Sequence, residues 1–120
     1  MAATLGLVLD CADPDRLAQF WSAAIGYTTL GGAGHYVMLV DEAGGQPKLL
    51  LQRVSEPKTG KNRMHLDIET PNVDEEVARL ESLGAQRIVD DALEEHGTRW
   101  VVMADPEGNE FCVCDGGQPA

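Results

Sequence analysis

The sequence has few basic residues. Lys and Arg together number nine against 20 Asp and Glu, which gives a formal net charge of −11. Because an acidic surface repels phosphate backbones and anionic membranes, we expect neither a nucleic-acid partner nor a membrane partner. The same charge can draw in a cationic ligand, or it can serve only to keep the protein in solution.

Long apolar runs are also lacking. The apolar run at residues 4–9 is short, has no basic residue before it, and leads directly into Asp10 and Asp13. This is the pattern of neither a signal peptide nor a membrane span, so we expect a cytoplasmic protein. A chain of 120 residues can bury the core of one domain and is too short for a second independent one.

There are only three cysteines, an odd number. Cys112 and Cys114 are two residues apart, so on one strand they point to the same face and not toward each other. We therefore expect reduced thiols and no disulfide framework. The chain also lacks a nucleophile elbow, a phosphate loop and a dinucleotide fingerprint, so none of those chemistries is indicated.

A diverged internal repeat organises the chain. Residues 63–69 alternate between polar and apolar side chains, as in a half-buried strand, and Asn72 then caps a helix that Gly84 ends. The apolar pair Leu66 and Ile68 stands 59 residues after a similar pair, Leu7 and Leu9. Each half of the chain therefore repeats one plan.

Periodicity and turn signals predict the same series of elements twice. In the first half we expect a strand at 5–11, a helix at 13–25, and strands at 27–30, 36–40 and 48–54, with glycine turns at 31–34 and 44–45. In the second half we expect a strand at 63–69, a helix at 72–84, and strands at 86–90, 98–104 and 110–115, with an acidic loop at 94–96, a turn at 105–109 and a frayed end at 116–120.

These series predict a single α+β domain made of two βαβββ modules. Module one covers residues 4–54, the linker 55–62, and module two 63–115. Trp21 lies on the apolar stripe of the first helix, so we expect it in the core. Each module leaves a sheet face opposite its helix, and joining these faces would curve the mixed sheets around a cleft.

Three motifs carry a family resemblance: FWSAAIGY at 20–27, HLDIE at 65–69 and DPEGNEF at 105–111. With the paired modules, they make the chain similar to the vicinal oxygen chelate (VOC) superfamily, which includes glyoxalase I, extradiol dioxygenases, fosfomycin-resistance enzymes and bleomycin-binding proteins. The resemblance covers nearly the whole chain and implies a glyoxalase-like fold. Members commonly pair, and an open sheet leaves edges that a second copy can cover, so we expect a homodimer.

The resemblance also implies where a metal would bind. Metal-dependent members hold a divalent cation through the first and last strands of each module, at positions that correspond here to Gly6, Gln52, His65 and Cys112. Glycine offers no donor and glutamine is a weak ligand, so we predict no cofactor. The less favoured alternatives are a metal held by His65, Gln52 and Cys112, or a zinc site of His65 with Cys112 and Cys114.

Strand parity predicts the side chains that line the cleft. They are Arg63, His65, Asp67 and Glu69 on one strand, Glu110, Cys112 and Cys114 on another, and Gly6, Val8 and Asp10 on the first. If the last hairpin pairs Ala104 with Glu110, Val102 and Trp100 join them, whereas a slip of one residue would replace Trp100 by Val101.

These residues make a mixture that is usual for an organic-ligand pocket. The candidate ligand-binding residues are Asp10, Gln52, Arg63, His65, Asp67, Trp100 and Cys112. Carboxylates beside Trp100 would favour cationic or amine-bearing aromatic compounds.

Two classes of function remain open. One is a metal-free binding module, which needs only a cavity. The other is a glyoxalase-type lyase or isomerase with a reduced metal site, or with His65 and Asp67 as an acid/base pair. A purely structural role is the alternative for two of these residues. His65 can hydrogen-bond to a neighbouring residue, and Arg63 can pair with Asp67 or Glu69. His35 and His96 stand beside glycines in expected turns, so we expect both to be exposed.

Overall fold

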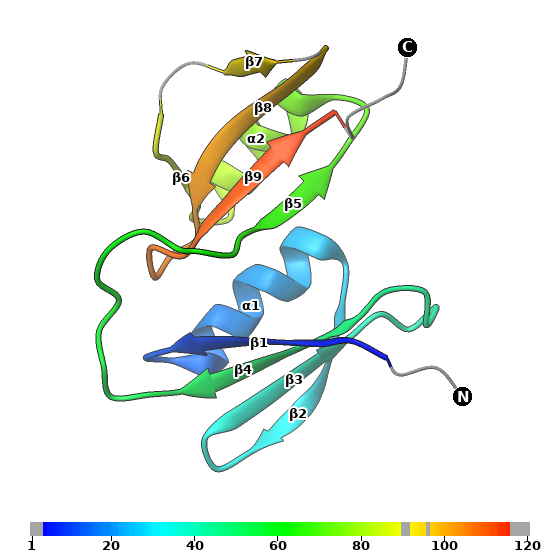
Figure 1. The fold of residues 1–120 in the computed structure, drawn as a ribbon. Helices are drawn as coiled ribbons and strands as arrows, with labels where there is room; N and C mark the ends of the chain where they lie inside the picture. The colour runs from blue at the N-terminus through cyan, green and yellow to red at the C-terminus, as the bar shows by residue number, and fades with distance from the viewer. Residues whose placement is uncertain (1–3, 90–91, 96, 116–120) are drawn as a thin grey trace. The chain divides into compact units, whose positions relative to one another are not determined.

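The computed structural model describes residues 4–89, 92–95 and 97–115. The chain forms two compact units, Met1–Lys58 and Thr59–Ala120, and the division falls inside the segment expected to be a linker. Each unit has one helix lying against one face of its own sheet (Figure 1). This is an α+β fold of two modules with open mixed sheets, as the sequence predicts.

The first unit is a four-stranded sheet covered by one helix. Its elements are β1 (Gly6–Cys11), α1 (Pro14–Ile25), β2 (Thr28–Ala33), β3 (Tyr36–Val40) and β4 (Lys48–Arg53). The strand order is β1-β4-β3-β2, with β1 parallel to β4 and the other pairs antiparallel. Helix α1 packs on β3 and β4, and Trp21 is 1% exposed, so its predicted place in the core is confirmed.

The second unit repeats this plan with one additional short strand. Its elements are β5 (Leu66–Glu69), α2 (Val73–Ser82), β6 (Gln86–Arg87), β7 (Leu93–Glu95), β8 (Thr98–Ala104) and β9 (Glu110–Cys114). The order is β5-β9-β8-β6, β7 pairs with β8, and β5 runs parallel to β9. Helix α2 packs on β8 and β9, so the opposite face of these strands is free for a site.

The two helices begin and end in equivalent ways, which confirms the internal repeat. The side chain of Asp13 accepts a hydrogen bond from the backbone N–H of Arg16, and that of Asn72 accepts one from Glu75. Such caps satisfy backbone donors that have no partner inside the helix. Both helices are followed by a glycine with positive φ, Gly26 and Gly84.

The glycine turn expected at 31–34 is only partly correct. Gly31 and Gly32 lie in β2, opposite Met38 and Val37, and the chain turns at Gly34 and His35. A register shift in β2 just before Gly31 brings that residue to a φ of 107°, which glycine tolerates without strain. His35 is exposed as expected, whereas His96 lies outside the described residues.

Three expectations for the second unit also change. The predicted acidic loop contains β7, because Leu93 to Glu95 pair with β8. Strand β5 begins at Leu66 and not at residue 63, because its pairing with β9 begins there. The strand expected at 86–90 is β6, confined to Gln86 and Arg87. Residue 90 and the end expected to fray, 116–120, lie outside the described residues.

The last hairpin has the predicted register. Ala104 pairs with Glu110, Val102 with Cys112 and Trp100 with Cys114, so the alternative slip does not occur. None of the three cysteines, Cys11, Cys112 and Cys114, forms a disulfide within the described residues. No helix within the described part of the chain is long and apolar enough to cross a membrane.

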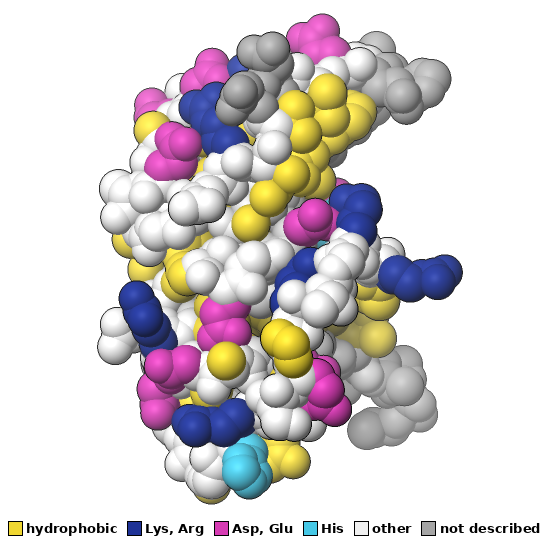
Figure 2. All heavy atoms as spheres, turned by 90° about the vertical axis from the view of Figure 1, so that its left-hand side faces the viewer, with side chains coloured by type: hydrophobic (Ala, Val, Ile, Leu, Met, Phe, Trp, Pro, Cys, Tyr) yellow, Lys and Arg dark blue, Asp and Glu magenta, His cyan; other side chains and the backbone are white. Residues whose placement is uncertain are grey.

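Charged side chains are mixed on the face drawn in Figure 2. Lys and Arg alternate there with Asp and Glu, without a continuous basic stripe among the described residues. Electrostatic binding of a phosphate backbone uses clustered positive charge.

Candidate functional site

A cavity of about 450 Å³ opens on the sheet of the second unit. Most of its residues alternate along β5, β8 and β9, on the face opposite α2. It is lined by Lys61, His65, Asp67, Glu69, Thr98, Trp100, Val102, Glu110, Phe111, Cys112 and Cys114.

Strand register arranges this lining in rows across the sheet. Asp67, Cys112 and Val102 are neighbours on β5, β9 and β8, and they form the middle row. Two residues further along, Glu69, Cys114 and Trp100 form a second row, which we call the Trp100 row. Rows two residues apart are separated by about 6.6 Å.

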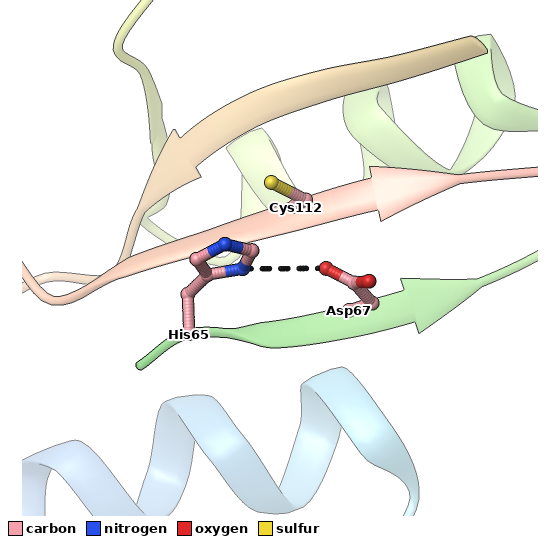
Figure 3. A group of neighbouring side chains, drawn as sticks. All are labelled: His65, Asp67 and Cys112. Carbon is pink, nitrogen blue, oxygen red and sulfur yellow. Dashed lines mark ion pairs between the residues drawn. The ribbon is translucent and has the colours of Figure 1, made fainter. Parts of the chain in front are cut away.

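Three side chains with atoms that could coordinate a metal ion lie close together at the middle row. Nδ1 of His65 lies 3.4 Å from Oδ1 of Asp67, and Figure 3 shows the imidazole and this carboxylate side by side, with Cys112 on the neighbouring strand β9. One ligand atom from each of His65, Asp67 and Cys112 lies within 4.8 Å of the other two. The His65 and Asp67 side chains are 42% and 52% exposed, whereas Cys112 is buried.

Cys112 has an environment that disfavours its thiolate. Burial, and then the negative charge of Asp67, raise the pKa of the Cys112 thiol from 9.0 to about 11. Lys61 opposes this rise, because its positive charge favours the thiolate. The thiol is therefore protonated at neutral pH and forms part of the cavity wall as a small, uncharged side chain.

An ion pair lies at the end of the cavity away from Trp100. Nζ of Lys61 lies 2.9 Å from Oε1 of Glu110. The Lys61 side chain is 71% exposed, whereas that of Glu110 is 16% exposed. Solvent weakens such a pair, but it brings a lysine from the segment before β5 to the cavity wall.

The family assignment follows from comparison with known proteins. Residues 6–114 match the model of the glyoxalase-like domain. The chain belongs to this family. No curated protein sequence matches the chain.

Solved structures share the fold of this glyoxalase-like domain at low sequence identity. A glyoxalase/bleomycin resistance protein/dioxygenase family enzyme from Burkholderia phytofirmans PsJN aligns with a TM-score of 0.76 and 17% identity, over 90% of this chain and 94% of that one. Lactoylglutathione lyase from Agrobacterium tumefaciens gives 0.66 and 21%, over 95% and 93%. TioX from Micromonospora sp. ML1 gives 0.62 and 21%, over 94% and 99%. These similarities establish the fold alone.

The structure brings together four of the seven candidate ligand-binding residues of this glyoxalase-like domain. His65, Asp67, Trp100 and Cys112 line the cavity. Arg63 is exposed and is not among the lining residues. Asp10 and Gln52 lie in the first unit, where they are neighbours on β1 and β4.

Sequence reasoning missed three residues of the cavity wall. Thr98 follows the same alternation as Trp100 and could have been found by extending the strand pattern one step. Phe111 has the opposite parity, and Lys61 comes from the expected linker, so periodicity gives no signal for either. The path of an irregular segment depends on tertiary contacts, which the local pattern does not contain.

The residues of this glyoxalase-like domain do not fit a four-ligand metal site of the kind that the superfamily resemblance implies. Gly6 has no side-chain donor, and Cys112 offers a thiol at the last-strand position. His65, Asp67 and Cys112 supply three of the ligand atoms that such a site would need, and these atoms lie within 4.8 Å of one another.

Proposed function

We propose that the cavity of the second unit binds a small organic ligand, one with an apolar or aromatic body and a positive charge, without a metal ion. Ligand sites in proteins commonly enclose about 300–1,000 Å³ and combine apolar walls with a few polar groups. The cavity of about 450 Å³ falls in this range. Its wall combines Trp100, Val102, Phe111 and two cysteines with ionisable groups.

The sign of the local charge carries this proposal. Three carboxylates line the cavity, from Asp67, Glu69 and Glu110, against one lysine, Lys61. The wall is therefore acidic, as is the chain as a whole at −11. An acidic wall attracts cations and rejects anions, and an indole face adds a cation–π contribution.

The reduced thiols support a cytoplasmic location. Cys11, Cys112 and Cys114 are buried, and no disulfide joins them within the described residues. Cytosolic proteins keep their thiols reduced, whereas small secreted domains commonly use disulfides. The proposed binding module therefore suits a reducing compartment.

A second candidate function is acid/base catalysis by a lyase or isomerase of glyoxalase type. The observation that favours it is the pair of His65 and Asp67, with Nδ1 and Oδ1 3.4 Å apart at the cavity wall. Such a carboxylate can orient an imidazole that moves a proton. This candidate requires a substrate whose proton His65 reaches, whereas the binding module requires only occupancy.

Thermal denaturation with a mixed library of metabolites and antibiotics tests the proposed binding. A ligand that binds only the folded state raises the midpoint of unfolding, and we expect cationic or amine-bearing aromatic compounds to give the largest shifts. The same compounds should quench tryptophan fluorescence, since Trp100 lines the cavity.

The variant Trp100→Phe provides the control. Trp21 is buried in the other unit and remains as a reference fluorophore, so most of the quenching should disappear while the protein stays folded. Hits that are thioesters, phosphonates or other anions, and that bind only with added metal, would contradict the proposal. Turnover of a hit that is lost in His65→Ala would instead favour the catalytic candidate.

A further inference from the structure

The two ends of the cavity differ in the charges that are available to a ligand. Glu69 belongs to the Trp100 row, whereas Glu110 lies four residues before Cys114 on β9. At about 3.3 Å per residue, these ends are about 13 Å apart along the sheet. A small ligand's single charged group can therefore bind at only one of them.

Glu110 already has a cation beside it. Lys61 lies 2.9 Å from its carboxylate, and the Glu110 side chain is mostly buried. The middle carboxylate, Asp67, faces His65 at 3.4 Å. A ligand that approaches either group competes with a side chain that is already in place.

Glu69 is in a different situation. Its side chain is exposed. Lys61 lies beside Glu110 and His65 beside Asp67, but within the described part of the chain no Lys, Arg or His forms an ion pair with the Glu69 carboxylate. Its neighbour on β9 is Cys114, whose small side chain stands between Glu69 and the indole of Trp100. Neighbouring strands are about 4.8 Å apart, so a space about two strands wide separates the carboxylate from the indole.

A quaternary or primary ammonium group fits this arrangement. It would have a carboxylate on one side and an aromatic face on the other, and both attract a positive charge. The opposite end presents the ammonium of Lys61 and the imidazole of His65. These groups donate hydrogen bonds to an acceptor.

We infer that the ligand's cationic group binds in the Trp100 row between Glu69 and Trp100. Lys61, which already pairs with Glu110, disfavours binding of a cation at that end of the cavity. This inference rests on the proposed function, because it assigns an orientation to the ligand of the same cavity. The ligand class is an elongated molecule with a cationic head and a hydrogen-bond acceptor at its other end.

Two matched carboxamide variants test this orientation. Glu69→Gln and Glu110→Gln each remove one negative charge from the same cavity wall, and Glu107→Gln removes one from the hairpin turn outside it. The probe is benzyltrimethylammonium chloride, titrated calorimetrically and by Trp100 fluorescence at about 0.15 M salt, where charges more than about 8 Å apart are screened. Phenylacetate serves as the anionic comparison.

We expect Glu69→Gln to weaken probe binding by about tenfold and Glu110→Gln by less than about threefold, because screening reduces the effect of the distant charge. Glu107→Gln should match the wild type. Lys61→Met should also change probe binding by less than about threefold, because Lys61 lies beside Glu110 and is equally distant from the Trp100 row. The midpoint of thermal unfolding, measured without probe, shows whether each variant is folded. If Glu69→Gln or Glu110→Gln does not fold, the Lys61→Met variant tests the orientation instead.

The outcomes separate this inference from the proposed function. A larger loss in Glu110→Gln than in Glu69→Gln, equal losses in both, or a large gain in affinity in Lys61→Met would overturn the orientation and leave a cation-binding cavity. Wild-type protein that binds phenylacetate in preference to the ammonium probe, or that binds neither, would overturn the proposed function and the orientation with it.

Discussion

Asp67 and Cys112 are direct neighbours on the parallel strands β5 and β9. Their side chains stand on the same face of the sheet, with the thiol in the cavity wall and the carboxylate beside it (Figure 3). Burial is the larger cause of the raised thiol pKa, and the charge of Asp67 is the second. The folded state therefore disfavours the Cys112 thiolate.

The first prediction concerns stability at alkaline pH. The pKa of the thiol is about 11 in the folded state against an ordinary value of 9.0. The protonated thiol therefore makes its full contribution to the free energy of unfolding below about pH 9. This contribution is lost between about pH 9 and 11, because the unfolded chain releases the proton first. In urea denaturation, wild-type protein should lose more stability than Cys112→Ala between pH 8 and pH 11. Parallel losses would show that Cys112 does not titrate differently on unfolding.

The second prediction concerns metal content. Because Gly6 provides no donor and the Cys112 thiol must lose a proton to bind a metal, purified protein should contain well under one equivalent of zinc, nickel, manganese or iron. Elemental analysis of protein purified without chelators measures this directly. Stoichiometric metal that disappears in His65→Ala would refute the metal-free proposal and favour an enzyme.

Much of the fold could be predicted from local sequence. The helix caps at Asp13 and Asn72 and the apolar alternation give both helices their positions. The DPEGN turn gives the register of β8 and β9, and through it the presence of Trp100 and Cys112 in the cavity wall. These features depend on neighbouring residues, so one sequence suffices to find them.

The remaining features depend on contacts between distant residues. Strand β7 exists because Leu93 lies opposite Trp100, although its own sequence is acidic and resembles a loop. Gly31 lies in a strand because β3 pairs with it, despite glycine's low strand propensity. Lys61 reaches Glu110, 49 positions away in the sequence, and no periodic pattern indicates that contact.

The third prediction concerns assembly. Each sheet is open, with β1 and β2 at the edges of the first and β5 and β6 at edges of the second. Unpaired edges favour association with another copy, so we expect a homodimer. Light scattering coupled to size exclusion should give twice the mass of the chain at micromolar concentration. A monomer mass that is constant over a dilution series would exclude this assembly.

The last prediction concerns the turn that sets the cavity register. Asp105 is 3% exposed, and its carboxylate accepts hydrogen bonds from the backbone N–H groups of Glu107 and Asn109, both at 2.9 Å. The side-chain amide of Asn109 also donates to this carboxylate. Asp105→Ala leaves these buried donors without an acceptor, so it should lower the free energy of unfolding by about 1–3 kcal/mol.

Chemical denaturation followed by circular dichroism measures this loss, and Glu107→Ala is the matched control. That variant keeps both the backbone donor of residue 107 and the Asp105 carboxylate that accepts from it, so it should lower the free energy of unfolding by less than Asp105→Ala does. Because β8 and β9 supply most of the cavity wall, Asp105→Ala should also weaken ligand binding. Equal stability of Asp105→Ala and Glu107→Ala would show that the carboxylate network does not hold the hairpin in register.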